Sequence, residues 1–129
     1  PPTQPSPSRG EGLIELTVVL ADDAFIRELN KTYRGKDKPT NVLSFPYTFP
    51  ESRVLNPEPY LGDIILAFDT IAKEAKAQQK TFRDHATHLI VHGVLHLLGY
   101  DHDRKKDAEA MEALEIKILK KLGVSNPYL

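Results

Sequence analysis

Three stretches of the chain carry the apolar and β-branched side chains that predict strands. They are residues 14–20 (IELTVVL), 41–47 (NVLSFPY) and 61–68 (LGDIILAF), and their enrichment in Val, Ile, Leu and Phe is typical of strands with a buried face. Pro46 ends the second stretch, because proline cannot donate to the ladder of a sheet. The proline-rich run at 50–59 predicts a loop between the second and third strands.

Four other segments place apolar residues three and four positions apart, which predicts helices. The first covers residues 21–34 and has the acidic residues Asp22 and Asp23 in its first turn. The second begins at a cap provided by Asp69 or Thr70. The third runs from about Phe82 to Leu98 and the fourth from Asp103 onward. The positions that define the first, second and fourth helices are Phe25, Ile26 and Leu29, then Ile71, Ala72 and Ala75, and finally Met111, Leu114, Ile118 and Leu122.

The third helix is apolar nearly all the way round, which is typical of a helix at the centre of a small domain. A buried imidazole must find a hydrogen-bond partner or a metal ion, because an unpaired buried polar group costs about 1–3 kcal/mol. The meaning of the histidines on this helix therefore depends on its burial. Its apolar positions are Ala86, Leu89, Ile90, Val91, Val94, Leu95, Leu97 and Leu98.

The composition is that of an ordinary globular protein. The chain has 129 residues, of which 40% are hydrophobic and 27% charged, enough for one domain with its own core. We expect this domain to span residues 13–129, and residues 1–12 (PPTQPSPSRGEG) to form a disordered arm because they lack apolar periodicity. The apolar runs are shorter than the roughly 20 residues of a membrane span and no secretory signal is recognisable, which predicts a cytoplasmic protein.

Cysteine content and net charge narrow the chemistry. The sequence contains no cysteine, so a disulfide framework is excluded and a metal ion could be held only by imidazole or oxygen ligands. The formal net charge is -1, which argues against a protein that coats nucleic acid by bulk electrostatics. A local basic patch remains compatible with this charge.

The segment HGVLHLLGYDH, residues 92–102, carries three histidines at metal-ligand spacing. His92 and His96 are four residues apart, about 6 Å along a helix, so both rings project from one face. Gly99 can end the helix in the left-handed conformation and return His102 towards the pair. Three nitrogen ligands leave one tetrahedral position open, which favours a catalytic zinc site over a structural one.

The spacing H-x-x-x-H-x-x-G-x-x-H is that of metzincin proteases, except that Gly93 replaces the protease glutamate. A lone histidine on an apolar helix is usually a core residue, and the third histidine is what favours metal here. His88 extends the stripe, but the ends of a stripe from His88 to His96 are about 12 Å apart and cannot share one ion. We therefore place His88 behind the ligands or in a structural role, and expect His85 to be exposed. Met111 is better explained by helical periodicity than by a metzincin Met-turn.

Together with YRGKDKPTNVLSFPY at 33–47 and LGDIILA at 61–67, this segment closely resembles the YbeY family of bacterial endoribonucleases, also described as ribosomal RNA maturation factors. The resemblance runs from about residue 13 to the end of the chain. It implies an α+β, zincin-like domain in which a mixed β-sheet packs with helices and a central buried helix carries the metal ligands. Family members usually begin with a further strand and helix, and the prolines of residues 1–12 stand in their place here.

The resemblance also implies roles for individual residues. The three histidines of the family motif bind zinc, which maps onto His92, His96 and His102, and the arginine of the YRG element, implicated in activity, maps onto Arg34. The implied function is a zinc-dependent, single-strand-specific endoribonuclease that matures the 3′ end of small-subunit ribosomal RNA and takes part in ribosome quality control. The implied partners are single-stranded ribosomal RNA and the ribosome or its small-subunit assembly factors.

The residue chemistry favours phosphodiester over peptide hydrolysis. Zinc held by three imidazoles lowers the pKa of its bound water to about 7, so Gly93 does not prevent hydrolysis. Peptide cleavage also needs a proton for the leaving amine, and losing the glutamate forfeits a contribution of about 10²- to 10⁴-fold. An RNA phosphate instead needs charge on its oxygens, which zinc and a bidentate Arg34 can share. The attacking oxygen could come from water or from the 2′-hydroxyl, and the sequence leaves both open.

The segment around Arg34 is locally basic. Lys31, Lys36 and Lys38 lie close to one glycine turn and predict contacts with an RNA backbone, although solvated lysines would show the same pattern. Tyr33 could stack on a base or belong to the core.

A few other polar residues are candidates for the site. Asp63 and Asp101 could orient a ligand imidazole, as carboxylates behind metal ligands do, or could be turn and cap residues. Ser44 and Asn41 could line the cleft, and His88 completes this group.

Two other functions fit parts of the pattern. A zinc peptidase or amidohydrolase would have this ligand spacing, but Gly93 argues against it. A non-catalytic ribosome-assembly module would use zinc for structure and Arg34 to grip a phosphate.

Overall fold

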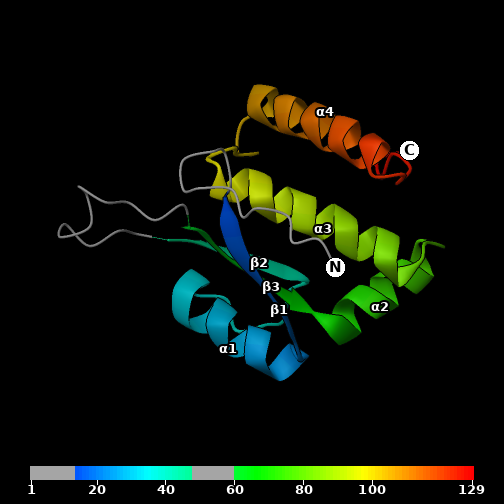
Figure 1. The fold of residues 1–129 in the computed structure, drawn as a ribbon. Helices are drawn as coiled ribbons and strands as arrows, with labels where there is room; N and C mark the ends of the chain where they lie inside the picture. Colours follow the sequence, from blue (N-terminus) through cyan, green and yellow to red (C-terminus); the bar gives the residue numbers. More distant parts are fainter. Residues whose placement is uncertain (1–13, 48–59) are drawn as a thin grey trace, which may run out of the picture.

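The computed structural model describes residues 14–47 and 60–129, in which a three-stranded sheet packs with four helices (Figure 1). The predicted α+β fold with a mixed sheet is confirmed in this part of the chain. The predicted arm at 1–12 and the predicted loop at 50–59 lie outside the described residues. The elements are β1 (Glu15–Ala21), α1 (Asp23–Arg34), β2 (Val42–Pro46), β3 (Tyr60–Ala67), α2 (Phe68–Ala77), α3 (Phe82–Leu97) and α4 (Lys105–Lys121).

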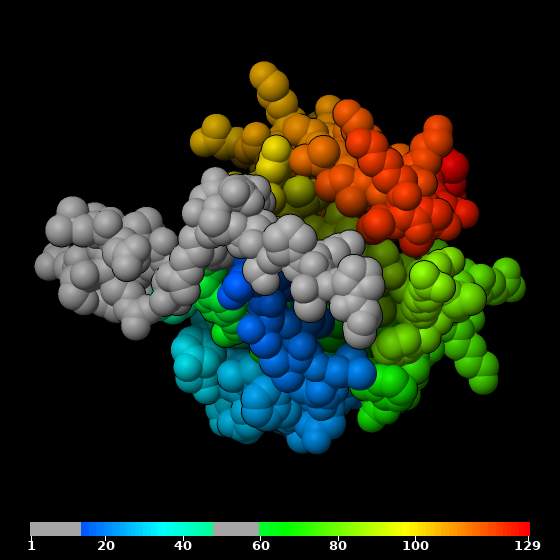
Figure 2. All heavy atoms as spheres, viewed as in Figure 1, coloured from blue at the N-terminus to red at the C-terminus, as the bar shows by residue number. Residues whose placement is uncertain are grey.

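The sheet has the order β1-β3-β2, with β1 parallel and β2 antiparallel to the central strand β3. Val18 of β1 and Ser44 of β2 both pair with Ile64 of β3, so these three side chains point to the same face. The strand β3 is covered on both faces, which explains its continuous apolar run. The strand β1 lies at the edge, and its Val18 and Leu20 side chains are 43% and 54% exposed (Figure 2).

The helices form layers on either side of the sheet (Figure 1). On one face Ile26 of α1 packs against Ile65, and on the other Leu89 of α3 packs against Ile64. Beyond α3 lies α4, and the side chains of Val91, Leu95, Met111 and Leu119 fill the space between these two helices. The helix α3 is therefore enclosed by protein on two sides, which confirms the predicted central buried helix. In residues 14–47 and 60–129 no helix is long and apolar enough to cross a membrane.

The end of α3 has the geometry that the sequence predicts. Gly99 has a φ of 101°, in the left-handed region that favours glycine. Its amide donates to the carbonyl oxygen of His96 at 3.0 Å, and the amide of Tyr100 donates to the carbonyl oxygen of Leu95 at 3.0 Å. This pair of bonds is a Schellman motif, which reverses the chain directly after His96, the second of the predicted ligands.

The helix α3 meets the sheet at Gly93, where there is no room for a side chain. A Cβ atom there would lie 2.9 Å from Oγ of Ser44 and 3.1 Å from Cδ1 of Ile64. The position at which metzincins carry their glutamate therefore faces the sheet in this fold. The absence of the protease glutamate at position 93 therefore goes together with a close packing contact that favours glycine there.

The predicted caps of the second helix are wrong. The helix α2 begins at Phe68 without a side-chain cap, because β3 runs directly into it. The hydroxyl of Thr70 donates instead to Oδ1 of Asp23 in α1, at 2.7 Å, and Asp69 lies exposed in the first turn.

The predicted exposure of His85 is also wrong, because α2 packs beside the first turns of α3. His85 is 4% exposed, and its Nε2 atom lies 2.9 Å from Oε1 of Glu74 in α2.

The helix α4 is rotated relative to the stripe predicted for it. Leu122 is 56% exposed, and the fully buried positions of α4 are Met111, Glu115 and Leu119. Phe25 of α1, which also counted toward a predicted apolar stripe, is 51% exposed.

Replacing Gly93 with Glu should lower the free energy of unfolding by roughly 3 kcal/mol or more. The substitution overfills the contact with Ser44 and Ile64 and buries a carboxylate that has no partner there. Urea unfolding followed by circular dichroism measures the change. The matched control is Arg83→Glu on the exposed first turn of α3, which should stay within about 0.5 kcal/mol of wild type; equal stabilities for the two variants would contradict the packing argument.

Candidate metal centre and adjoining cleft

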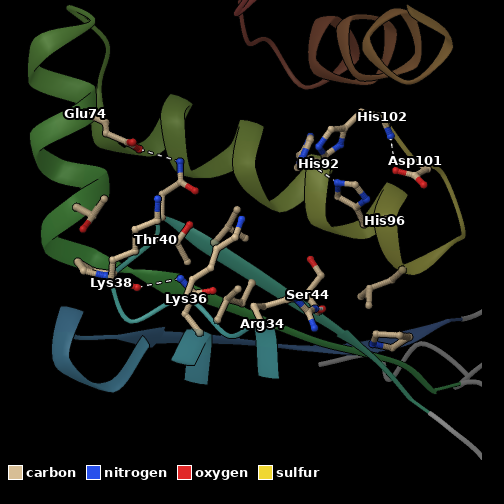
Figure 3. Close-up of a pocket in the computed structure, with 18 of the residues that line it drawn as sticks. Arg34, Lys36, Lys38, Thr40, Ser44, Glu74, His92, His96, Asp101 and His102 are labelled. Carbon is tan, nitrogen blue, oxygen red and sulfur yellow. Dashed lines mark hydrogen bonds between the residues drawn. The ribbon is translucent and has the colours of Figure 1, made fainter. Parts of the chain in front are cut away.

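The structure brings the rings of His92, His96 and His102 together at the end of α3 (Figure 3). One ligand atom from each residue lies within 4.8 Å of the other two. The helical spacing aligns the first two rings, and the reversal at Gly99 returns the third. The ring centroids are 4.5 Å apart for His92 and His96 and 4.9 Å apart for His96 and His102. This cluster could hold one metal ion.

Hydrogen bonds determine which nitrogen atoms His92 and His96 present to the cluster. Nδ1 of His92 donates to Oε1 of Glu115 at 2.6 Å, and Nδ1 of His96 donates to the carbonyl oxygen of Tyr100 at 3.1 Å. An ionised carboxylate and a carbonyl only accept, so each Nδ1 carries the proton and each Nε2 presents a lone pair.

The two Nε2 atoms lie 3.0 Å apart. Two ligands of a tetrahedral ion with bonds of about 2.0–2.1 Å are separated by about 3.3 Å, which is close to this distance. Facing lone pairs repel one another unless a cation lies between them. Neutral imidazoles are also the form that binds metal, and burial together with the neighbouring His92 and His102 lowers the pKa of His96. The donor set therefore fits a divalent metal ion.

Glu115 of α4 anchors this cluster from behind. It is 0% exposed, and besides His92 it accepts hydrogen bonds from Nε2 of His88 at 3.1 Å and from the Tyr128 hydroxyl at 2.5 Å. Burial alone raises the pKa of Glu115, but the bonds from His88, His92 and Tyr128 outweigh it and hold the pKa at about 2. Burial and the Glu115 carboxylate raise the pKa of Tyr128. Glu115 is therefore an ionised acceptor at neutral pH, and it connects His88 to His92.

Glu115 is not among the residues that the sequence pattern predicts for the site. The residue lies four positions after Met111 and four before Leu119, both of which are buried. A carboxylate at a buried helical spacing was the available signal. The predicted apolar stripe runs through Leu114 and Ile118. Glu115 lies beside that stripe, so the pattern predicts that it faces solvent.

A cleft of about 1080 Å³ extends from the histidines along β2 (Figure 3). Arg34 lies at its side, where its Nη2 donates to the carbonyl oxygen of Ser44 at 2.9 Å and its guanidinium carbon lies 5.2 Å from the centre of the Phe45 ring. These contacts hold the guanidinium group in place while leaving donors free toward the cleft. The candidate residues that line the cleft are Arg34, Lys36, Lys38, Asn41, Ser44, His92, His96, Asp101 and His102.

Two of the candidate RNA contacts lie away from this cleft in the described part of the chain. Tyr33 is 61% exposed, and its ring packs edge-on against Phe45 at a centroid distance of 5.3 Å. Lys31 lies exposed in the last turn of α1 and does not line the cleft.

The two aspartates suggested as partners of a ligand imidazole have other roles. Asp63 pairs in register with Phe45, on the face of the sheet that α1 covers, and it accepts a hydrogen bond from the Tyr60 hydroxyl. It therefore cannot orient a histidine of α3. Asp101 accepts from the backbone amides of His102 and Asp103 at 2.6 and 3.2 Å, so it shapes the turn that carries His102 rather than the orientation of a ring.

Comparison with known proteins identifies a family. The family model described as endoribonuclease YbeY matches residues 6–123. Curated relatives named endoribonuclease YbeY include one from Rhizobium etli, 57% identical over 114 residues, or 88% of this chain and 66% of the relative. One from Parvibaculum lavamentivorans is 54% identical over 127 residues, or 94% of this chain and 69% of the relative. One from Methylocella silvestris is 54% identical over 114 residues, or 88% of this chain and 62% of the relative. The chain thus spans about two thirds of the length of these relatives.

A solved structure also resembles this fold. The solution structure of TM1509 from Thermotoga maritima matches with a TM-score of 0.52 and 29% sequence identity. The match covers 87% of this chain and 73% of the other.

Replacing Glu115 with Gln should weaken zinc binding about 10- to 100-fold, as is typical when the hydrogen-bond partner of a metal ligand is lost. The neutral amide accepts more weakly from Nδ1 of His92, and its NH₂ group must find an acceptor where His88 and Tyr128 both donate. Competition with a chromophoric chelator measures the zinc affinity. Glu112→Gln, at an exposed position of α4, is the control. A folded Glu115→Gln protein with wild-type affinity would show that Glu115 does not position His92.

Proposed function

This chain belongs to the endoribonuclease YbeY family, and from that membership we propose that it is a zinc-dependent, single-strand-specific endoribonuclease. Its proposed substrate is the 3′ end of small-subunit ribosomal RNA, which it would cut during ribosome maturation and quality control in the cytoplasm. Its proposed partners are the ribosome or small-subunit assembly factors. The observation that carries this proposal is the convergence of His92, His96 and His102, in which the Nε2 atoms of the first two lie 3.0 Å apart, at one end of a cleft that also holds Arg34.

The proposed metal ligands are His92, His96 and His102. A divalent ion bound there would supply positive charge for a phosphoryl oxygen and would lower the pKa of water. Glu115 and the carbonyl oxygen of Tyr100 engage Nδ1 of the first two rings, so that their Nε2 atoms, 3.0 Å apart, would be the atoms that hold the ion. The exposed His102 closes the site from the loop after Gly99.

Arg34 is the proposed phosphate clamp. Its Nη2 donates to the Ser44 carbonyl oxygen at 2.9 Å and its Nη1 to the Tyr33 carbonyl oxygen at 3.5 Å, and the Phe45 ring lies against the guanidinium group. The remaining N–H groups can bind two non-bridging oxygens of a phosphate and stabilise the charge that grows on them during cleavage. Lys36 and Lys38 line the same cleft and would attract the flanking phosphates in a salt-dependent way.

The packing at Gly93 supports a nuclease rather than a peptidase. The metzincin glutamate would have to enter the contact between α3 and the sheet, where its Cβ would lie 2.9 Å from Oγ of Ser44 and 3.1 Å from Cδ1 of Ile64, so that both side chains would have to move. A leaving amine would therefore lack its proton donor, whereas an RNA ribose oxygen is a better leaving group and depends less on such a donor.

Substitution of Arg34 and His92 separates the steps of this mechanism. Arg34→Glu should retain zinc but reduce cleavage of a labelled single-stranded RNA by about 10²- to 10³-fold, the usual cost of losing a charge that stabilises the transition state. His92→Ala should lose both zinc and cleavage. Elemental analysis and gel-based cleavage assays measure the two quantities, with Lys121→Glu on the exposed end of α4 as the control.

Each alternative function has its own outcome in the same assays. Activity that persists unchanged in metal-free protein would refute the zinc nuclease. Peptide turnover faster than RNA turnover would favour the peptidase. A wild-type protein that binds but never cleaves RNA after rigorous removal of contaminating nucleases would favour the assembly module.

A further inference from the structure

The cleft continues past Arg34 to a second polar cluster on α2. Figure 3 shows Glu74 at the end of the cleft away from the three histidines, and Lys36 and Lys38 line the same cleft. Glu74 contacts His85, which precedes His92 by seven residues on α3. At about 1.5 Å per residue, the cluster lies about 10 Å along the helix axis from the metal centre. It is therefore too distant to contact the phosphate being cut, and lies where a neighbouring nucleotide would be.

Glu74 is held as a rigid acceptor. Its Oε1 atom accepts from Nδ2 of Asn41 at 3.0 Å and lies 2.9 Å from Nε2 of His85, which is 4% exposed. Both donors bind the same oxygen. Among the described residues no hydrogen bond reaches Oε2, although the side chain is 35% exposed and lines the cleft. One carboxylate oxygen is thus fixed in direction and available to a ligand.

The charge of this end of the cleft decides which part of an RNA strand can reach it. Arg34, Lys36 and Lys38 attract phosphates, whereas the Glu74 carboxylate repels them. A carboxylate accepts hydrogen bonds and cannot donate them. Among the groups of an RNA strand, only the uncharged donors of the bases and the ribose hydroxyl can therefore meet Oε2. Uracil offers a single ring N–H between two carbonyl oxygens, which a carboxylate repels, so its edge is disfavoured.

We propose that Glu74, oriented by Asn41 and His85, forms a base-reading subsite that accepts a hydrogen bond from the exocyclic amino group of adenine, cytosine or guanine. This subsite rests on the proposed function, because it requires single-stranded RNA to bind in the cleft. It makes Glu74 a specificity residue one or more nucleotides away from the cleavage position. Discrimination of a base by a carboxylate that accepts from its amino group has the same chemical basis in other nucleic-acid complexes.

The variant Glu74→Gln tests this directly. Its amide oxygen can still accept from Asn41 and His85, while its NH₂ group replaces the free acceptor with a donor. Zinc-loaded wild type should bind and cut strands with an amino-bearing base at the read position about tenfold better than strands with uracil there. Glu74→Gln should lose or reverse this preference. A variant that merely loosens the fold would instead weaken all strands alike.

The substrates are labelled single strands in which one variable base is moved stepwise across the positions around the cut. Fluorescence anisotropy reports binding and gel assays report cleavage. The control is Asp69→Asn, an acid-to-amide change at an exposed position of the same helix that does not line the cleft, and it should keep the wild-type preference. Zinc content and circular dichroism verify that each variant retains its metal and its fold.

The outcomes separate this inference from the proposed function. An identical base preference in Glu74→Gln and wild type, or no preference in wild type, would overturn the subsite. A preference that disappears when the 2′-hydroxyl of the read nucleotide is removed would show that Glu74 binds ribose instead, and would also overturn it. If wild type binds with the expected preference but cuts no strand, the nuclease proposal fails while the subsite stands.

Discussion

Each histidine of α3 must find its partner inside the protein, because the helix lies between the sheet and α4. His85 meets Glu74, His88 and His92 share Glu115, and His96 meets the carbonyl oxygen of Tyr100. An imidazole that donates from one nitrogen presents a lone pair at the other. The burial of this helix therefore decides which ring nitrogen of each histidine is engaged by a partner in the protein, and with it the direction in which the candidate metal site faces.

The two carboxylates that contact α3 come from opposite sides and serve different ends of the cleft. Glu115 of α4 is fully buried, uses both oxygens internally and acts on the metal centre only through His92. Glu74 of α2 lines the cleft, and the hydrogen bonds that it makes among the described residues use only its Oε1 atom. A pair of histidine and carboxylate can thus serve two purposes. Where the carboxylate is fully buried, as at Glu115, the pair can orient a histidine of the candidate metal site. Where the carboxylate is partly exposed, as at Glu74, the pair can contact a substrate.

The close approach of α3 to the sheet connects the metal centre to the basic side of the cleft. Gly93 lets Ser44 of β2 lie directly beneath the helix, and the Ser44 carbonyl oxygen in turn holds Arg34. A larger residue at position 93 would push the sheet and the arginine away from the histidines. Gly93, which stands where metzincin proteases have their catalytic glutamate, therefore also sets the distance between the histidine cluster and Arg34. An RNA phosphate would need both a metal ion at that cluster and the guanidinium group.

The sequence alone determined those features of the protein that depend on local backbone geometry. The spacing of His92 and His96, and the reversal at Gly99 that returns His102, are encoded within eleven consecutive residues and follow from the helical period and from the left-handed conformation of glycine. The roles of Glu115, Glu74, His85 and Asp63 were decided only by the tertiary structure. The rotation of α4, the packing of α2 beside α3 and the register of β3 select which face each of these side chains occupies. A slip of one residue in β3 would move Asp63 to the other face of the sheet, and a shift of one residue in a helix would turn its side chains by about 100°.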